Sequence, residues 1–191
     1  GEKMTMEDAL YGLMLESAND IAMGIAEHVA GSVDGFVQMM NDKAAQLGCV
    51  NTHFANPHGL FDEQHYTCAR DMAIITQAAI ANPTFCKITG TVEYTIEKTN
   101  KVDENRYLLN HQKMLYDDEF KYDGCLGGKT GFVTESLNTL VTFAQKDDKK
   151  LICIILKVNG SGKTFTETAD LLDYVLIAPD GKIQDVWSGY G

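Results

Sequence analysis

The sequence lacks several features that would assign it to a function class at once. No apolar run approaches the roughly 20 residues of a membrane-spanning helix, the longest being residues 151–156. Basic residues are few: 16 Lys and Arg stand against 27 Asp and Glu, and the formal net charge is −11. This charge argues against nucleic acid and anionic lipid as partners, since both need a basic surface. No charged stretch followed by an apolar stretch opens the chain, so no signal peptide is expected.

Patterns typical of metal sites and disulfide frameworks are also missing. The cysteines are odd in number and widely spaced, without a C-x-x-C: Cys49, Cys68, Cys86, Cys125 and Cys153. We expect most of them to be buried free thiols rather than zinc ligands. His53, His58 and His65 lack helical i, i+4 spacing, and structural hydrogen bonding is the favoured interpretation. No metal and no organic cofactor is therefore expected.

The two halves of the chain differ in pattern. The first half predicts four helices, which open at Thr5, run from Asn19 to Val29, extend from Ser32 to Gly48, and cover about 71–81. The second half predicts strands at 91–96, 140–144 and 151–158, then a helix over 164–177. The tail from Pro179 has no clear pattern. The prediction is one α/β domain over 1–191, with a helical part at about 1–89 and a sheet with a C-terminal helix at about 90–178.

Two tripeptides can supply chemistry: Ser17-Ala18-Asn19 and Lys129-Thr130-Gly131. Alone, each is typical of a helix cap or a turn with a solvated lysine. Together they belong to a three-part motif set of serine acyl-transfer enzymes that bind β-lactams. The third part, Ser-x-x-Lys, carries the nucleophile. It is absent, because no serine is followed by lysine three residues later: Ser17, Ser32, Ser136, Ser161 and Ser188.

Segments around these tripeptides carry a resemblance. Residues 1–15 resemble the helix that leads to a family's Ser-x-Asn motif, residues 51–60 a loop and 65–73 the helix start after it, and 127–132 the Lys-Thr-Gly strand. From residue 1 to about 174 the chain resembles a serine-type D-alanyl-D-alanine carboxypeptidase, a low-molecular-mass penicillin-binding protein. The resemblance implies a β-lactamase/transpeptidase-like α/β fold with an antiparallel sheet and a helical subdomain. The family's N-terminal strands and nucleophile helix would be lacking.

The resemblance also implies roles for individual residues. Ser17 would relay a proton to the departing amine, Asn19 would hold the peptide backbone, and Lys129 would attract the substrate carboxylate. The strand after Lys129 would pair with the substrate, and one of its backbone N–H groups would stabilise the oxyanion. Three residues are expected to bind substrate in this way: Thr130, Gly131 and Phe132.

The implied function is the trimming of D-alanine from peptidoglycan stem peptides through an acyl-enzyme, outside the cytoplasmic membrane, with β-lactams as further ligands. Two alternatives stay open: a β-lactam hydrolase of the same fold, and a non-catalytic peptidoglycan-binding module. This chain alone is expected to be inactive. Without the missing strands it would expose an apolar face and a strand edge, so we expect self-association or a separate N-terminal segment.

Overall fold

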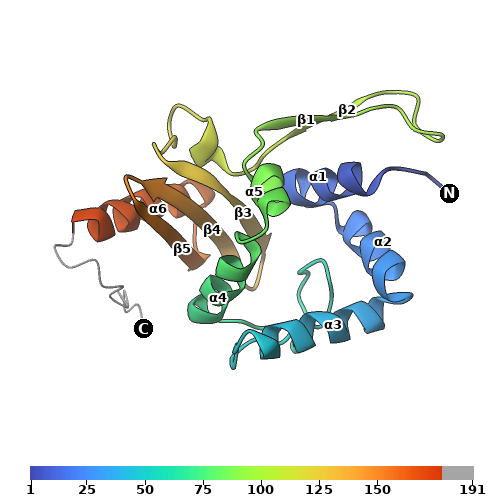
Figure 1. Cartoon of the computed structure of the whole chain (residues 1–191), viewed down its shortest axis with the longest axis horizontal. Coiled ribbons are helices and arrows are strands. Elements are labelled where there is room, and N and C mark those ends of the chain that lie inside the picture. The colour runs from blue at the N-terminus through green and yellow to red at the C-terminus, as the bar shows by residue number, and fades with distance from the viewer. Residues whose placement is uncertain (178–191) are drawn as a thin grey trace.

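The computed structural model describes residues 1–177, and the tail from Pro179 lies outside them. Five helices come first: α1 (Met6–Glu16), α2 (Asn19–Ala30), α3 (Val33–Gln46), α4 (Ala69–Ala79) and α5 (Pro83–Thr89). The strands and two further helices follow: β1 (Glu93–Ile96), β2 (Arg106–Leu109), η1 (Lys113–Leu115), β3 (Cys125–Val133), β4 (Leu137–Lys146), β5 (Lys149–Val158) and α6 (Ser161–Ile177). This order of helices, antiparallel strands and a final helix confirms the predicted α/β class (Figure 1).

Side-chain caps explain where the helices begin. The Thr5 hydroxyl oxygen accepts the Asp8 N–H at 3.0 Å, and the hydroxyl donates to the Asp8 carboxylate at 2.6 Å, so the first helix opens at Thr5 as predicted. The sequence also predicts that α4 ends before Pro83, and it does. It does not predict α5, in which Pro83 occupies the first turn and Asn82 is the cap. Proline needs no N–H acceptor there, so it opens this helix.

The strands form two separate antiparallel sheets. The larger sheet has the order β3-β4-β5, with Lys129 opposite Val141 and Thr142 opposite Cys153. The smaller is a ribbon of β1 and β2, which projects from the body beside α1 (Figure 1). The sequence does not predict β2. Among the described residues, β3 and β5 each keep one edge without a strand neighbour.

Two hydrophobic clusters hold the molecule together. One joins the larger sheet to α6 and η1: Met114, Leu140, Ala144, Cys153, Ile155, Phe165 and Leu172. The other joins α1 and α5 to the ribbon: Tyr11, Leu15, Ile88, Ile96 and Leu108. Within the described residues, α2 and α3 contribute to neither cluster. The end of α1 and the strand β3 therefore take their support from different cores.

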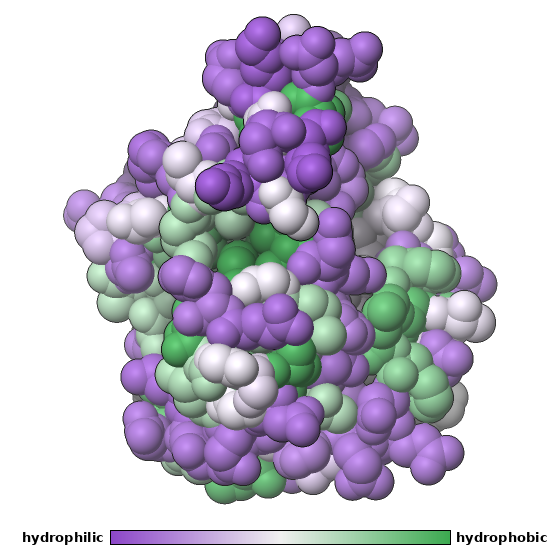
Figure 2. Space-filling view, turned by 90° about the vertical axis from the view of Figure 1, so that its right-hand side faces the viewer, coloured by the Kyte–Doolittle hydropathy of each residue, from purple (hydrophilic) through white to green (hydrophobic). Residues whose placement is uncertain are grey.

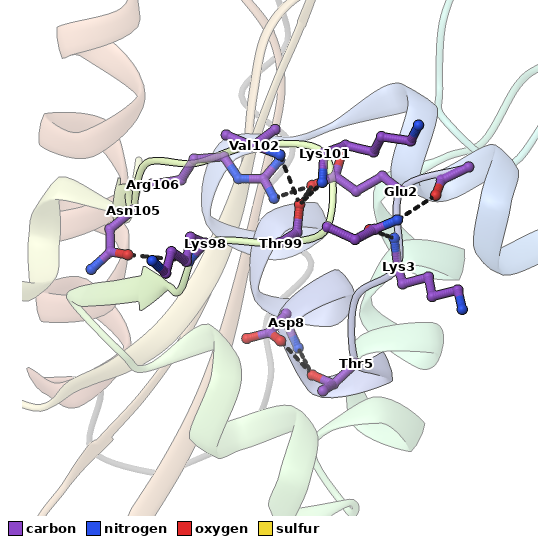
Figure 3. A network of polar contacts seen from close by, with 12 residues as sticks. Glu2, Lys3, Thr5, Asp8, Lys98, Thr99, Lys101, Val102, Asn105 and Arg106 are labelled. Atoms are coloured by element: carbon purple, nitrogen blue, oxygen red, sulfur yellow. Dashed lines mark hydrogen bonds and ion pairs between the residues drawn. The ribbon is translucent and has the colours of Figure 1, made fainter.

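A polar network binds the N-terminal segment to the loop of the ribbon (Figure 3). The Glu2 carboxylate accepts hydrogen bonds from the Arg106 guanidinium at 2.5 Å and from the Thr99 hydroxyl at 2.7 Å. These donors hold the pKa of Glu2 below its ordinary value. The Lys3 backbone N–H donates to Asn100 Oδ1 at 2.7 Å. The network fixes the start of α1 along the ribbon.

Aromatic packing extends this attachment along α1. The Tyr11 and Tyr94 rings stack with centroids 3.7 Å apart, and the Tyr94 hydroxyl donates to Asp8 at 2.9 Å. Burial, together with this carboxylate acceptor, raises the pKa of Tyr94 to about 12. Because α1 is held at both its start and its middle, the position of its C-terminal end is set by the β1–β2 ribbon.

The histidine-rich loop before α4 is held by its own backbone. Ring nitrogens of the three histidines lie 2.5–3.2 Å from backbone atoms of the same loop: His53, His58 and His65. Burial lowers the pKa of His65. Over residues 1–177, no group of three or more His, Cys, Asp or Glu side chains could hold a metal ion. In the same residues no helix is long and apolar enough to cross a bilayer.

Candidate functional site

The site begins where α1 ends, at a residue in an unusual conformation. Ser17 has φ 57° and ψ 40°, in the left-handed region, and its N–H donates to Gly12 O. For a residue with a side chain this conformation costs about 1 kcal/mol or more, and it persists where the surroundings fix it. The chain then turns at once into α2, which starts at Asn19. The conformation at Ser17 thus joins two helices within a tight corner.

The residue before this corner is tied to the ribbon. One Glu16 carboxylate oxygen accepts the Leu109 backbone N–H at 3.0 Å. The other lies 3.5 Å from His111 Nε2. Sequence reasoning missed Glu16, because its partners lie more than ninety residues away and no motif marks them.

The second half of the site lies on β3, where two glycines precede Lys129. A Cβ atom on Gly128 would lie 2.1 Å from the Val141 carbonyl oxygen and 2.6 Å from Gln112 Nε2. Gly127 has φ 153°, next to an irregularity in the β3–β4 register. Neither position can hold a larger residue without moving its neighbours, so the glycines set the path of the strand into Lys129.

The two halves meet at one contact. The Lys129 ammonium donates to Ser17 Oγ and, at 2.8 Å, to the Thr130 carbonyl oxygen. Folding therefore brings Ser17 and Lys129 into contact, although 112 positions separate them. Burial lowers the pKa of Lys129 from its ordinary 10.5 to about 8. No carboxylate among residues 1–177 forms an ion pair with this lysine.

The other predicted site residues surround this contact. Asn19 is exposed at the start of α2, and no described contact joins it to Lys129, so its part in the site stays a prediction. Thr130 and Gly131 are half-buried on β3, and Phe132 is 66% exposed. All three lie on a strand whose outer edge has no strand neighbour in the described chain.

Chemically, this arrangement offers a cation without a counter-ion, a hydroxyl in contact with it, and exposed backbone donors and acceptors along β3. A partly buried ammonium binds a carboxylate through charge-assisted hydrogen bonds. An open strand edge pairs with an extended peptide. The geometry therefore suits an extended peptide that ends in a carboxylate.

Comparison with known sequences gives a consistent result. The pattern of the D-alanyl-D-alanine carboxypeptidase family matches residues 1–160. The chain is 35% identical over 175 residues to D-alanyl-D-alanine carboxypeptidase DacF of Bacillus subtilis, which covers 91% of this chain and 43% of DacF. It is 30% identical to DacC of Escherichia coli, over 99% of this chain and 48% of DacC. The chain thus spans less than half the length of these two relatives.

Solved structures agree with this result. The Streptomyces K15 DD-transpeptidase superposes with a TM-score of 0.86 at 28% identity, over 93% of this chain and 70% of that one. The D-alanyl-D-alanine carboxypeptidase of Mycobacterium tuberculosis H37Rv superposes with a TM-score of 0.81 at 30% identity, over 93% and 66%. With its fold, its paired motifs and the family pattern in agreement, the chain belongs to the D-alanyl-D-alanine carboxypeptidase family.

Proposed function

We propose that this chain is the larger part of the catalytic domain of a serine-type D-Ala-D-Ala carboxypeptidase that trims peptidoglycan stem peptides. The observation that carries the proposal is the contact between Lys129 and Ser17 beside the open edge of β3. The peptide would pair with β3 and place its terminal carboxylate at Lys129 and Thr130. Such a reaction takes place outside the cytoplasmic membrane, where the polymer lies.

The proposed chemistry divides between this chain and a nucleophile that it does not contain. A serine from a Ser-x-x-Lys motif would attack the carbonyl between the two D-alanines and form an acyl-enzyme. Ser17 would pass a proton to the departing amine, and a Lys129 amine with a pKa of about 8 suits proton transfer near neutral pH. The Phe132 N–H would be one oxyanion donor and the nucleophile's own N–H the other. Asn19 would hold the substrate backbone.

The chain alone is therefore proposed to be inactive. Its sequence has no Ser-x-x-Lys. The upstream segment proposed to supply this motif would also cover apolar surface that the chain exposes. Figure 2 shows hydrophobic patches between hydrophilic residues on one face, and large apolar side chains of α2 and α3 are about half exposed, namely Val29 and Met39.

The release of D-alanine tests the proposed reaction. The protein carrying the sequence encoded upstream of Gly1 is incubated with a peptide that ends in D-Ala-D-Ala, beside the 191-residue chain alone. We expect release only from the longer protein. If the longer protein has Ser-x-x-Lys and binds penicillin but releases no D-alanine, the carboxypeptidase proposal is wrong and a β-lactam hydrolase or a binding module takes its place.

Association of the chain tests the proposed missing segment. Light scattering on the purified 191-residue chain should show oligomers, because apolar patches and open strand edges promote association. Adding the upstream segment as a separate polypeptide should return the protein to a one-to-one complex. A stable monomer with no second polypeptide would show that the exposed surface needs no cover.

A further inference from the structure

The two halves of the site are supported by different hydrophobic cores, yet one short segment contacts both halves of the site. Ser17 follows α1 in the core with the ribbon, while Lys129 lies on β3 in the larger sheet. Residues 109–112 run from the end of β2 to β3, where Gln112 packs against Gly128. We propose that this segment is a strut that sets the Ser17–Lys129 contact, with Glu16 and Gln112 as positioning residues at its two ends.

At the first end, the strut holds the corner that contains Ser17. The Leu109 N–H donates to Glu16 at 3.0 Å, and His111 Nε2 lies 3.5 Å from the same carboxylate. Both groups belong to the strut, so the Glu16 carboxylate is held by contacts with two of its residues. Because Glu16 directly precedes the left-handed Ser17, fixing its side chain fixes the direction from which Ser17 meets Lys129.

The middle of the strut is rigid. The Asn110 side chain is 2% exposed, and its amide donates to the Thr89 and Thr91 carbonyl oxygens at 3.0 and 2.8 Å. Its side-chain oxygen accepts the Gln112 N–H at 2.9 Å. The Tyr116 hydroxyl donates to the Asn110 carbonyl oxygen at 2.9 Å. With these groups paired inside the protein, the strut transmits position from one end to the other.

At the second end, the strut supports β3 directly before Lys129. Gln112 is fully buried, and its amide donates to Thr142 Oγ1 at 2.7 Å. Thr142 lies opposite Gly128 in the strand register, and Gly128 packs so closely on Gln112 that a Cβ would not fit. Gln112 Oε1 has no described hydrogen-bond partner, so the amide is retained there at an energetic cost. A positioning role accounts for a buried polar side chain at this place.

Charge alone would be a simpler role for Glu16, and the two roles predict opposite signs. If Glu16 acts only as a nearby anion, removing it destabilises the Lys129 ammonium and lowers the pKa of Lys129 further. If Glu16 acts as a tether, removing it lets the Ser17 corner leave β3. Water then reaches Lys129, and its pKa rises toward the ordinary value.

The test measures the pKa of Lys129 in the 191-residue chain by NMR titration of its 13Cε resonance, assigned with Lys129→Arg. Glu16→Ala should raise this pKa by about one unit, the size of a partial loss of burial. Glu16→Gln keeps an oxygen that accepts from Leu109 and should leave the pKa unchanged. Glu7→Ala is the matched control, since Glu7 is an exposed glutamate of the same helix, paired with Lys87.

The outcomes separate the roles. A rise in Glu16→Ala with no change in Glu16→Gln or Glu7→Ala supports the strut, whereas a fall in both Glu16 variants, or no change in any, overturns it. If Glu16→Ala does not fold, Glu16→Asp takes its place, because its shorter carboxylate keeps the charge but cannot reach Leu109. A rise in the pKa of Lys129 in Glu16→Asp supports the tethering role of Glu16, and an unchanged pKa contradicts that role.

The other end has its own variant. Gln112→Met keeps the length of the side chain and removes the hydrogen bond to Thr142. It should raise the pKa of Lys129, as Glu16→Ala does. An unchanged pKa of Lys129 in a folded Gln112→Met chain would show that Gln112 is not part of the strut. The catalytic meaning of the strut rests on the proposed function, but this measurement does not. If the longer protein releases no D-alanine while the pKa shifts of Lys129 appear, the positioning role of the strut is supported and the proposed carboxypeptidase reaction is wrong.

Discussion

At Lys129, burial and charge oppose each other, and a substrate carboxylate would relieve that conflict. Under the proposed function, a charge-assisted contact between Lys129 and the carboxylate of a β-lactam would be worth roughly 1.5–3 kcal/mol, so Lys129→Ala should slow acylation of the longer protein by a β-lactam about one to two orders of magnitude. The stopped-flow or gel rate of acylation measures this, with the exposed Lys146→Ala of the same sheet as control. Unchanged acylation at normal thermal stability would exclude Lys129 from the site.

A second residue-level prediction concerns Asp71, which anchors the loop before α4. Its carboxylate is fully buried and accepts from the Asn51 N–H at 2.7 Å and the Thr52 hydroxyl at 2.9 Å. Burial raises the pKa of Asp71, but these donors outweigh it, and the pKa lies below the ordinary 3.8. A depressed pKa stabilises the fold above the unfolded-state value, and this stabilisation is lost as pH falls through the folded-state pKa.

Thermal melts against pH check this prediction. Wild type should melt higher than Asp71→Asn at neutral pH, and the difference should shrink as pH falls below about 3.8. The exposed Asp123→Asn is the matched control, and at neutral pH it should melt close to wild type. A difference between wild type and Asp71→Asn that persists undiminished at pH 2 would mean that the charge of Asp71 is not what holds the loop.

Among the elements, β3 has packing that leaves no room for a side chain at Gly128. Gly128→Ala places a methyl group against the Val141 carbonyl and Gln112, and overpacking of this kind costs typically 1–3 kcal/mol. Gly24→Ala is the control: its Cβ meets nothing within 4 Å on α2, and it should stabilise the helix by roughly 0.5–1 kcal/mol. Urea unfolding of both variants measures the contrast. Equal effects of the two substitutions would contradict the tight packing described for β3.

The elements also show how far sequence reasoning reaches. Helices α1 to α4 follow from caps and periodicity, and β4 and β5 from their β-rich composition and the turn between them. The ribbon strand β2 has four residues and draws its stability from pairing with β1, which no local pattern reveals. Helix α5 has seven residues and starts at a proline, which the sequence presents as the end of α4. Short elements owe their existence to tertiary contacts, so their local signals are weak.

The same limit applies to the site. The motifs predict Ser17 and Lys129 because the chemistry fixes those residue types at those positions. Glu16 and Gln112 carry no motif, since they act through contacts with residues 93 and 30 positions away. Only the folded chain identifies them.

On the scale of the whole molecule, the Lys129–Ser17 contact links the end of α1 to the larger sheet, and no serine of the chain lies in a Ser-x-x-Lys motif. The proposed function requires that an upstream Ser-x-x-Lys segment completes this site. Mass spectrometry after incubation with penicillin tests the claim most directly. We expect no adduct on the 191-residue chain, and one stoichiometric adduct, on the upstream serine, in the protein that carries the segment. A stoichiometric adduct on Ser17 of the chain alone would contradict the account.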